Sequence, residues 1–117
     1  MKKFLFIQEQ APHKSLTPRE GLDAVLMGSA FVECSLLFLG DGIFQILKGQ
    51  DTAPLSRKNF TLGYAALKDY GVENIYCYQN DLDERMLKVA DLTIDIQVLA
   101  QDEIPVLFNN HDVILTF

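Results

Sequence analysis

The chain has 117 residues, of which 49% are hydrophobic and 22% are charged, and its formal net charge is −6. This length predicts one domain over residues 1–117 with a single hydrophobic core, and the composition excludes a disordered chain. Ten basic residues are scattered among sixteen acidic ones and form no positively charged stripe, so direct binding to nucleic acid is not expected.

The N-terminal segment MKKFLFIQEQAP has two lysines but only four apolar residues directly before Gln8. A secretory signal needs an apolar run of about 7–15 residues. A membrane helix needs roughly 20, and no run in the sequence approaches that length. "FLFI" indicates a buried strand instead, and we expect a cytoplasmic protein without membrane contact.

The first predicted elements are a strand over residues 3–8 and a helix over residues 17–33. The strand has a nearly continuous apolar centre. Thr17 is a suitable N-cap for the helix, Pro18 fits the first helical position, and Glu20 follows three residues after the cap. The apolar residues that follow recur at helical spacing, which predicts one face packed against a sheet.

The next segment, CSLLFLG over residues 34–40, has the pattern of a strand buried on both faces. A GDG turn at 40–42 ends it, and residues 43–49 are predicted to form a short helical turn or a loop. A further helix is predicted over 56–71, where Gly71 stops it.

The second half of the chain continues the same alternation. Pro105 is tolerable only near the first turn of the helix that contains it. The order of elements predicts an α/β fold with a parallel sheet covered by helices on both sides. The remaining elements are a strand over 73–79, a helix over 81–92, a strand within 93–100, a short helix over 101–111 and a closing strand over 112–117.

Motifs for nucleotide binding or hydrolysis are missing: the sequence has no GxGxxG, no P-loop and no GxSxG. Two separated cysteines and the distant His13 and His111 do not resemble the roughly four ligands of a zinc site, and a disulfide is not expected in the cytosol. No metal or cofactor is therefore predicted. His13 is either a general base or a loop residue with structural or interface contacts, and His111 is predicted to cap a helix C-terminus or lie on the surface.

Cys77 is the candidate for covalent chemistry. Alternation along its strand places Tyr76 and Tyr78 on one side of the sheet and the thiol on the other. A thiol in apolar surroundings has a raised pKa and is inert, which favours a core residue, as it does for Cys34. A nucleophile in an open α/β sheet nevertheless tends to lie near a strand's carboxyl end. From spacing alone, Cys77 is therefore either a core residue or a reactive thiol.

Two further groups of residues have alternative interpretations. Acidic residues in the first turn of the helix over 81–92 can complement the helix dipole or take part in acid–base chemistry. Apolar residues after the GDG turn can cover the chain's own core or contact a neighbouring chain. The acidic group is Asp81, Asp83 and Glu84; the possible interface is Ile43, Phe44, Gln45, Ile46 and Leu47. Helical spacing also predicts Phe31, Phe60 and Tyr64 as core residues.

Three segments resemble one family in their order and spacing: APHKSLTPREGLDAVL (11–26), GDGIFQILKGQ (40–50) and HDVILTF (111–117). The parts REGLDA (19–24) and DGIFQ (41–45) are the most specific. Together they resemble the TusC-type, DsrF-like branch of the DsrE/DsrF/DsrH superfamily of sulfur-relay proteins, over nearly the whole chain.

This resemblance implies a three-layer α/β/α sandwich with a five-stranded parallel sheet. It also implies assembly with TusB-like and TusD-like chains as a dimer of heterotrimers. Such a complex accepts persulfide sulfur from TusA and passes it to TusE for 2-thiolation of the tRNA wobble uridine (mnm5s2U). The sulfur-carrying cysteine is expected on the TusD-type partner, at the end of the third strand.

The segment LDERM (82–86) is similar to the helical stretch that follows this cysteine in the family, with Met86 where glycine is usual. Counting back from it places the family's thiol position on Tyr78, and one residue reverses the face of a strand. The resemblance thus implies a non-catalytic subunit. The alternatives are a self-sufficient persulfide sulfurtransferase that uses Cys77 and a homo-oligomeric α/β binding module.

Overall fold

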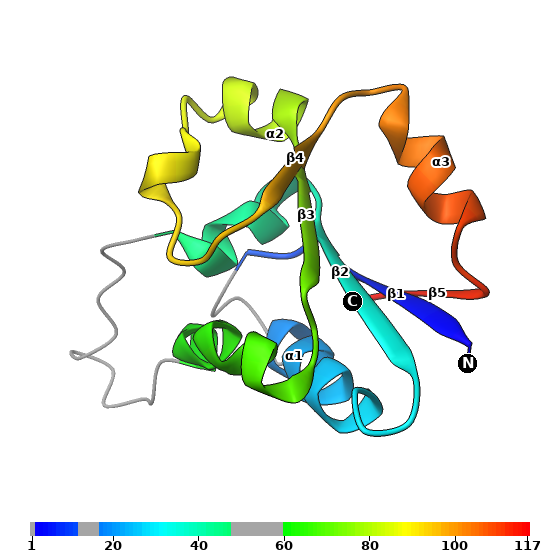
Figure 1. Ribbon diagram of the computed structural model, residues 1–117. Helices are drawn as coiled ribbons and strands as arrows, with labels where there is room; N and C mark the ends of the chain where they lie inside the picture. Colours follow the sequence, from blue (N-terminus) through cyan, green and yellow to red (C-terminus); the bar gives the residue numbers. More distant parts are fainter. Residues whose placement is uncertain (1, 12–16, 48–59) are drawn as a thin grey trace.

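The computed structural model describes residues 2–11, 17–47 and 60–117 (Figure 1). At its centre is a five-stranded sheet in the order β4-β3-β2-β1-β5, in which all neighbouring strands are parallel. The predicted α/β fold and its parallel sheet are confirmed. The strands are Lys3–Gln8 (β1), Glu33–Phe38 (β2), Asn74–Tyr78 (β3), Gln97–Leu99 (β4) and Val113–Thr116 (β5).

Helices cover both faces of the sheet, which makes three layers (Figure 1). α1 and η3 lie side by side over one face, and α3 lies over the other. No helix in the described part of the chain is both long and apolar enough to cross a membrane. The helices are α1 (Thr17–Gly28), α2 (Gln79–Glu84) and α3 (Glu103–Asn109), with 3-10 helices η1 (Gly40–Ile46), η3 (Phe60–Tyr70) and η4 (Val89–Asp91).

The central strands bury apolar residues on both faces, because helices lie on each side of them. The larger cluster is on the side of α1 and η3, and the smaller one is under α3. Alternation along each strand divides the residues between the two. On the α1 side the strands contribute Phe6, Cys34, Leu36, Phe38, Ile75 and Cys77; on the α3 side they contribute Leu5, Ile7, Leu37 and Leu99.

The first two predicted elements keep their positions, but the predicted helix over 17–33 is too long. α1 ends at Gly28, whose carbonyl oxygen accepts hydrogen bonds from the N–H groups of Phe31 (2.9 Å) and Val32 (3.0 Å). This turn redirects the chain into β2, which starts at Glu33. β2 ends at Phe38, ahead of Gly40, which has a φ of +54°.

The prediction of one helix over residues 81–92 is wrong. α2 ends at Glu84, and the N–H of Leu87 turns back to the carbonyl oxygen of Leu82 at 2.9 Å. Met86 has a φ of +53°, a left-handed conformation that glycine adopts more readily than other residues. The chain resumes helical structure only in η4.

The other boundaries agree with expectation apart from small shifts. The residues after the GDG turn form a helical turn, because η1 runs from Gly40 to Ile46. Gly71, with a φ of +81°, ends η3, and Pro105 lies in the first turn of α3. The predicted helix over 56–71 begins in a part of the chain outside the described residues.

Candidate functional site

The carboxyl ends of β2 and β3 form the candidate site, because the resemblance found in the sequence implies that the thiol position of related chains corresponds to Tyr78, at the end of β3. In an open parallel sheet, ligands bind beyond the carboxyl ends of the strands. Gly40 and Asp41 follow β2, while Tyr78 is the last residue of β3 and α2 starts directly after it. The two strands are hydrogen-bonded neighbours, and Phe38 pairs with Cys77 at this end.

Cys77 is completely buried in the cluster on the α1 side. The pKa of this thiol is raised to about 12. Burial is the larger cause of the shift, and the nearby Asp81 carboxylate is the smaller one. The thiolate is the nucleophilic form of cysteine, and such a thiol holds almost none of it at neutral pH. The environment of Cys77 therefore favours the interpretation as a packed core thiol.

Tyr78 lies on the opposite face from Cys77 and is half-buried at the end of β3. Cys34 is at the start of β2, at the other end of the sheet, and is also buried and unpaired. Neither cysteine thus presents an accessible thiol at the carboxyl end of the sheet. Within the described residues, no group of three or more His, Cys, Asp or Glu side chains is arranged to hold a metal ion.

The segments that follow β2 and β3 are linked by hydrogen bonds and ion pairs of Asp81 and Arg85. The N–H of Gly40 donates a hydrogen bond of 2.8 Å to Oδ2 of Asp81. Arg85 lies 2.9 Å from Oδ1 of Asp41 through Nη2, and 3.6 Å from Oδ1 of Asp81 through Nη1. Its guanidinium carbon is 5.8 Å from the centre of the Phe44 ring. The Asp81 carboxylate therefore has a structural role here.

A buried triangle of polar side chains lies beneath η1. Gln8 donates from Nε2 to the hydroxyl of Tyr64 at 3.0 Å, and that hydroxyl donates to Oε1 of Gln45. Gln45 completes the triangle with a 3.4 Å bond from Nε2 to Oε1 of Gln8, and it also reaches the carbonyl oxygen of Gln10 at 2.8 Å. Burial raises the pKa of Tyr64, so this phenol stays protonated. All three side chains are fully buried with partners, which fixes η1 to β1 and η3.

Two glycines make room for Gln8. A Cβ atom at Gly21 would lie 2.3 Å from Nε2 of Gln8, and one at Gly42 would lie 1.9 Å from its carbonyl oxygen. Gly21 belongs to REGLDA, while Gly42 and Gln45 belong to DGIFQ. The two most specific segments of the sequence thus meet around one buried glutamine, a role that sequence reasoning missed.

The possible interface after the GDG turn divides into two groups. Ile43, Gln45 and Ile46 are fully buried in the chain's own core, so these three cannot form an exposed contact surface. Burial supports the alternative in which this segment covers the core. Phe44 and Leu47 are only partly buried, and their place at an interface stays a prediction.

The remaining predicted residues have different outcomes. Tyr64 is a core residue, as predicted, whereas Phe31 is 81% exposed because α1 ends before it. Nδ1 of His111 lies 2.7 Å from the carbonyl oxygen of Leu107 near the end of α3, which agrees with a helix C-terminal cap. His13 and the side chain of Phe60 lie outside the described residues.

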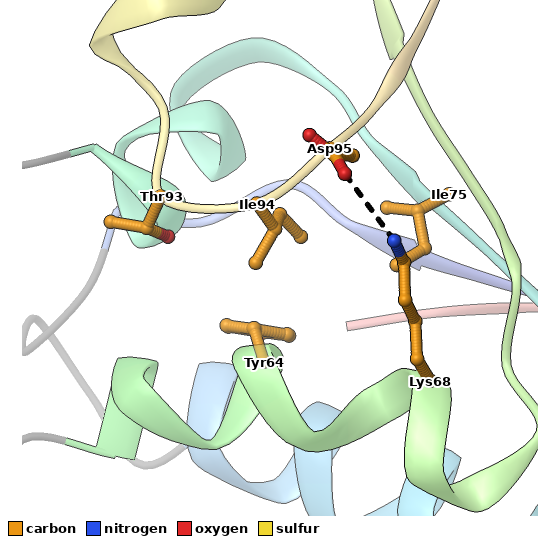
Figure 2. Close-up of a pocket in the computed structure, with 6 residues that line it drawn as sticks. All are labelled: Tyr64, Lys68, Ile75, Thr93, Ile94 and Asp95. Carbon is orange, nitrogen blue, oxygen red and sulfur yellow. Dashed lines mark hydrogen bonds and ion pairs between the residues drawn. The ribbon is translucent and has the colours of Figure 1, made fainter.

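A cavity of about 200 Å³ lies between η3 and the segment before β4 (Figure 2). Lys68 and Asp95 face each other at one side of it, with Nζ 3.3 Å from Oδ2. Both side chains are largely exposed, and Tyr64, Ile75 and Ile94 supply apolar walls. Because its two charges neutralise each other, this cavity does not present a charged site to a ligand.

Comparison with known proteins gives consistent results. A sequence model of the DsrE/DsrF-like family matches residues 2–117. The chain is 34% identical over 118 residues to "Protein TusC homolog" of Vibrio vulnificus (strain YJ016), with 100% of both chains covered. It is 40% identical over 93 residues to "Intracellular sulfur oxidation protein DsrF" of Allochromatium vinosum, covering 79% of this chain and 68% of that protein. The ychN protein from E. coli shares the fold, with a TM-score of 0.83, 19% identity and 100% of both chains covered.

Proposed function

Because the chain belongs to the DsrE/DsrF-like family, we propose that it is a non-catalytic subunit of a TusBCD-like sulfur-relay complex. Its proposed partners are TusB-like and TusD-like chains in a dimer of heterotrimers in the cytoplasm. The complex would pass persulfide sulfur from TusA to TusE for 2-thiolation of the tRNA wobble uridine. The relationship to TusC-type proteins, predicted from the sequence, is confirmed by the full-length matches.

One observation carries the non-catalytic assignment. Persulfide transfer needs a thiolate that can reach a donor. In this chain the position at the end of β3 is Tyr78, while the neighbouring Cys77 is buried, faces the other side of the strand and has a pKa raised to about 12. The sulfur-carrying thiol is therefore proposed to be on a partner chain.

The name of the DsrF relative places that protein in intracellular sulfur oxidation. This supports a sulfur-handling context for the present chain. We favour tRNA thiolation over sulfur oxidation, because the TusC-type relatives match over the full length of the chain, whereas the DsrF relative matches over 79% of it.

Native mass spectrometry of the tagged protein, purified from its own cells after supply of a persulfide donor, tests the proposal. The expected particle contains six chains of three kinds, and the added sulfur mass is on a partner chain. Recovery of the chain alone or self-associated, with added sulfur on Cys77, would show that it is a sulfurtransferase in its own right.

Cysteine variants of the purified complex separate these possibilities further. Alanine avoids placing an unpaired hydroxyl in the core. Cys77→Ala and the matched control Cys34→Ala each remove one buried thiol of the same cluster. Both complexes are expected to transfer sulfur at the rate of the unmodified complex. Loss of transfer in Cys77→Ala alone, with the complex intact, would support the self-sufficient enzyme.

A further inference from the structure

The α3 face of the sheet is only partly covered. α3 has seven residues and is the one helix that lies on this face within the described part of the chain (Figure 1). A helix with its side chains is about 10–12 Å wide, whereas five strands at about 4.8 Å spacing extend over about 19 Å. On this face the residues Asn74, Tyr76 and Tyr78 of β3 are only partly buried and Gln97 of β4 is exposed, so no helix fully covers this part of the sheet.

Two cavities lie beside α3 over this uncovered part. Their volumes are about 310 and 370 Å³, and both are lined by Tyr76, Leu107 and Asn110, so they form one continuous groove. The first extends toward the start of β2, and the second toward β4 and the start of α3. We call this surface the α3 groove; its lining includes Ser35, Asn74, Tyr76, Gln97, Leu107 and Asn110.

Ser35 is the least satisfied polar residue of the groove. It is only 4% exposed, and its hydroxyl has no hydrogen-bond partner among residues 2–11, 17–47 and 60–117. Buried hydroxyl groups are nearly always hydrogen-bonded in folded proteins. The side-chain amides of Asn74, Gln97 and Asn110 likewise make no hydrogen bond within those ranges. The groove thus offers several polar groups to something that enters it.

The charges of the groove indicate what can enter. Asp102, Glu103 and Glu33 contribute three carboxylates to the lining, against the single ammonium group of Lys3. A second copy of this chain would bring a further net charge of −6, and a nucleic acid would bring phosphates. Both would meet like charge, which opposes association. A cationic polypeptide is complementary to the groove.

We propose that the α3 groove docks an arginine-bearing segment of a partner chain, with the guanidinium group over the Tyr76 ring and within reach of Ser35 and Asn110. A guanidinium group has five N–H donors and stacks on aromatic faces, so it matches a phenol ring surrounded by acceptors better than an ammonium group does. This inference rests on the proposed function in taking the partner to be a chain of the sulfur-relay complex.

Site-specific photo-crosslinking in the intact complex tests the docking. A benzoylphenylalanine at Gln97 is expected to crosslink to a segment of a different chain that contains an arginine. The matched control at Asp23, exposed on α1 in the opposite layer, is expected to miss that segment. A crosslink to a second copy of this chain, or to a segment without arginine, overturns the proposal.

A charge substitution provides the second measurement. Asp102 is exposed and makes no side-chain hydrogen bond at the start of α3, so Asp102→Lys should leave the fold intact. It is expected to weaken association with the partner chain by about tenfold and to reduce its salt dependence. Asp23→Lys is the control. If the complex assembles and the two variants bind the partner chain with equal affinity, the docking proposal is wrong but the proposed function stands. If the unmodified chain never joins a complex, the proposed function is wrong as well.

Discussion

Replacing Tyr64 by phenylalanine removes one oxygen atom from the buried polar triangle and leaves the aromatic ring in place. The ring would keep its edge-to-face contact with Phe38, at 5.2 Å between centroids. The lost hydroxyl accepts one hydrogen bond from Gln8 and donates one to Gln45. Tyr64→Phe therefore tests the contribution of the polar network separately from that of apolar packing.

The size of the effect follows from burial. Gln8 and Gln45 are fully buried, so bulk water cannot replace the lost partner. A buried polar group left without a partner costs about 1–3 kcal/mol. Gln45 would keep its 2.8 Å bond from Nε2 to the carbonyl oxygen of Gln10, so the loss at this residue is confined to Oε1, which accepts from the Tyr64 hydroxyl. We expect the free energy of unfolding to fall by about 2–3 kcal/mol in total.

Urea unfolding followed by circular dichroism measures this change. With a urea dependence of about 1.5 kcal/mol per molar, the midpoint should fall by about 1.3–2 M. Tyr70→Phe is the control, because Tyr70 belongs to the same helix η3 but its side chain is 54% exposed, and its effect should stay below about 0.5 kcal/mol. Coincident midpoints for the two variants would refute the reasoning.

Three further predictions concern the glycines, the thiol and the carboxyl-end ion pair. Gly42→Ala should prevent folding, because the added Cβ would lie 1.9 Å from a carbonyl oxygen of β1. In the control Gly28→Ala the added Cβ would lie 3.5 Å from its nearest neighbour, and the soluble yield should be normal. Equal soluble yields of the two variants would contradict this reasoning. Cys77 should resist iodoacetamide at pH 8 in the folded protein. The pKa of this thiol rises from 9.0 in the unfolded chain to about 12 on folding. The free energy of unfolding should therefore fall between pH 9 and pH 12, by up to about 1.4 kcal/mol per pH unit. Urea titrations of Cys77→Ala should show no such contribution to the pH dependence. Asp81→Asn should lower the unfolding free energy by about 1–2 kcal/mol in thermal melts, whereas the exposed Glu84→Gln should change it by less than about 0.5.

The strands were predictable because their signals are local. KFLFIQ gives β1 with its observed bounds, since a short apolar run of this length fits a buried strand better than a helix. Alternation also placed Cys77 on the correct face, opposite its two tyrosine neighbours. The helix over 81–92 failed because one left-handed residue, Met86, ends α2 without disturbing the apolar spacing.

The polar triangle could not be predicted from spacing. Gln8 and Gln45 are 37 positions apart in the sequence, and Tyr64 lies on a third element. Each residue alone looks like an ordinary polar residue at the end of an apolar run. Their common burial follows from strand order and from the close approach that Gly42 allows, which are properties of the tertiary structure.

The position of β5 beside β1 has a consequence for the order in which the protein folds. The backbone N–H of Lys3 donates a hydrogen bond to the carboxylate of Asp112, which is 109 positions away in the sequence. The ring of Phe117 also stacks on that of Phe6. Contacts between such distant positions slow folding, because a long loop must close before they form. Since β1 has a much nearer sequence neighbour in β2, we expect β1, α1 and β2 to form the nucleus and β5 to dock last. The edge strand β5 should then be the last part of the sheet to gain protection from hydrogen exchange during refolding.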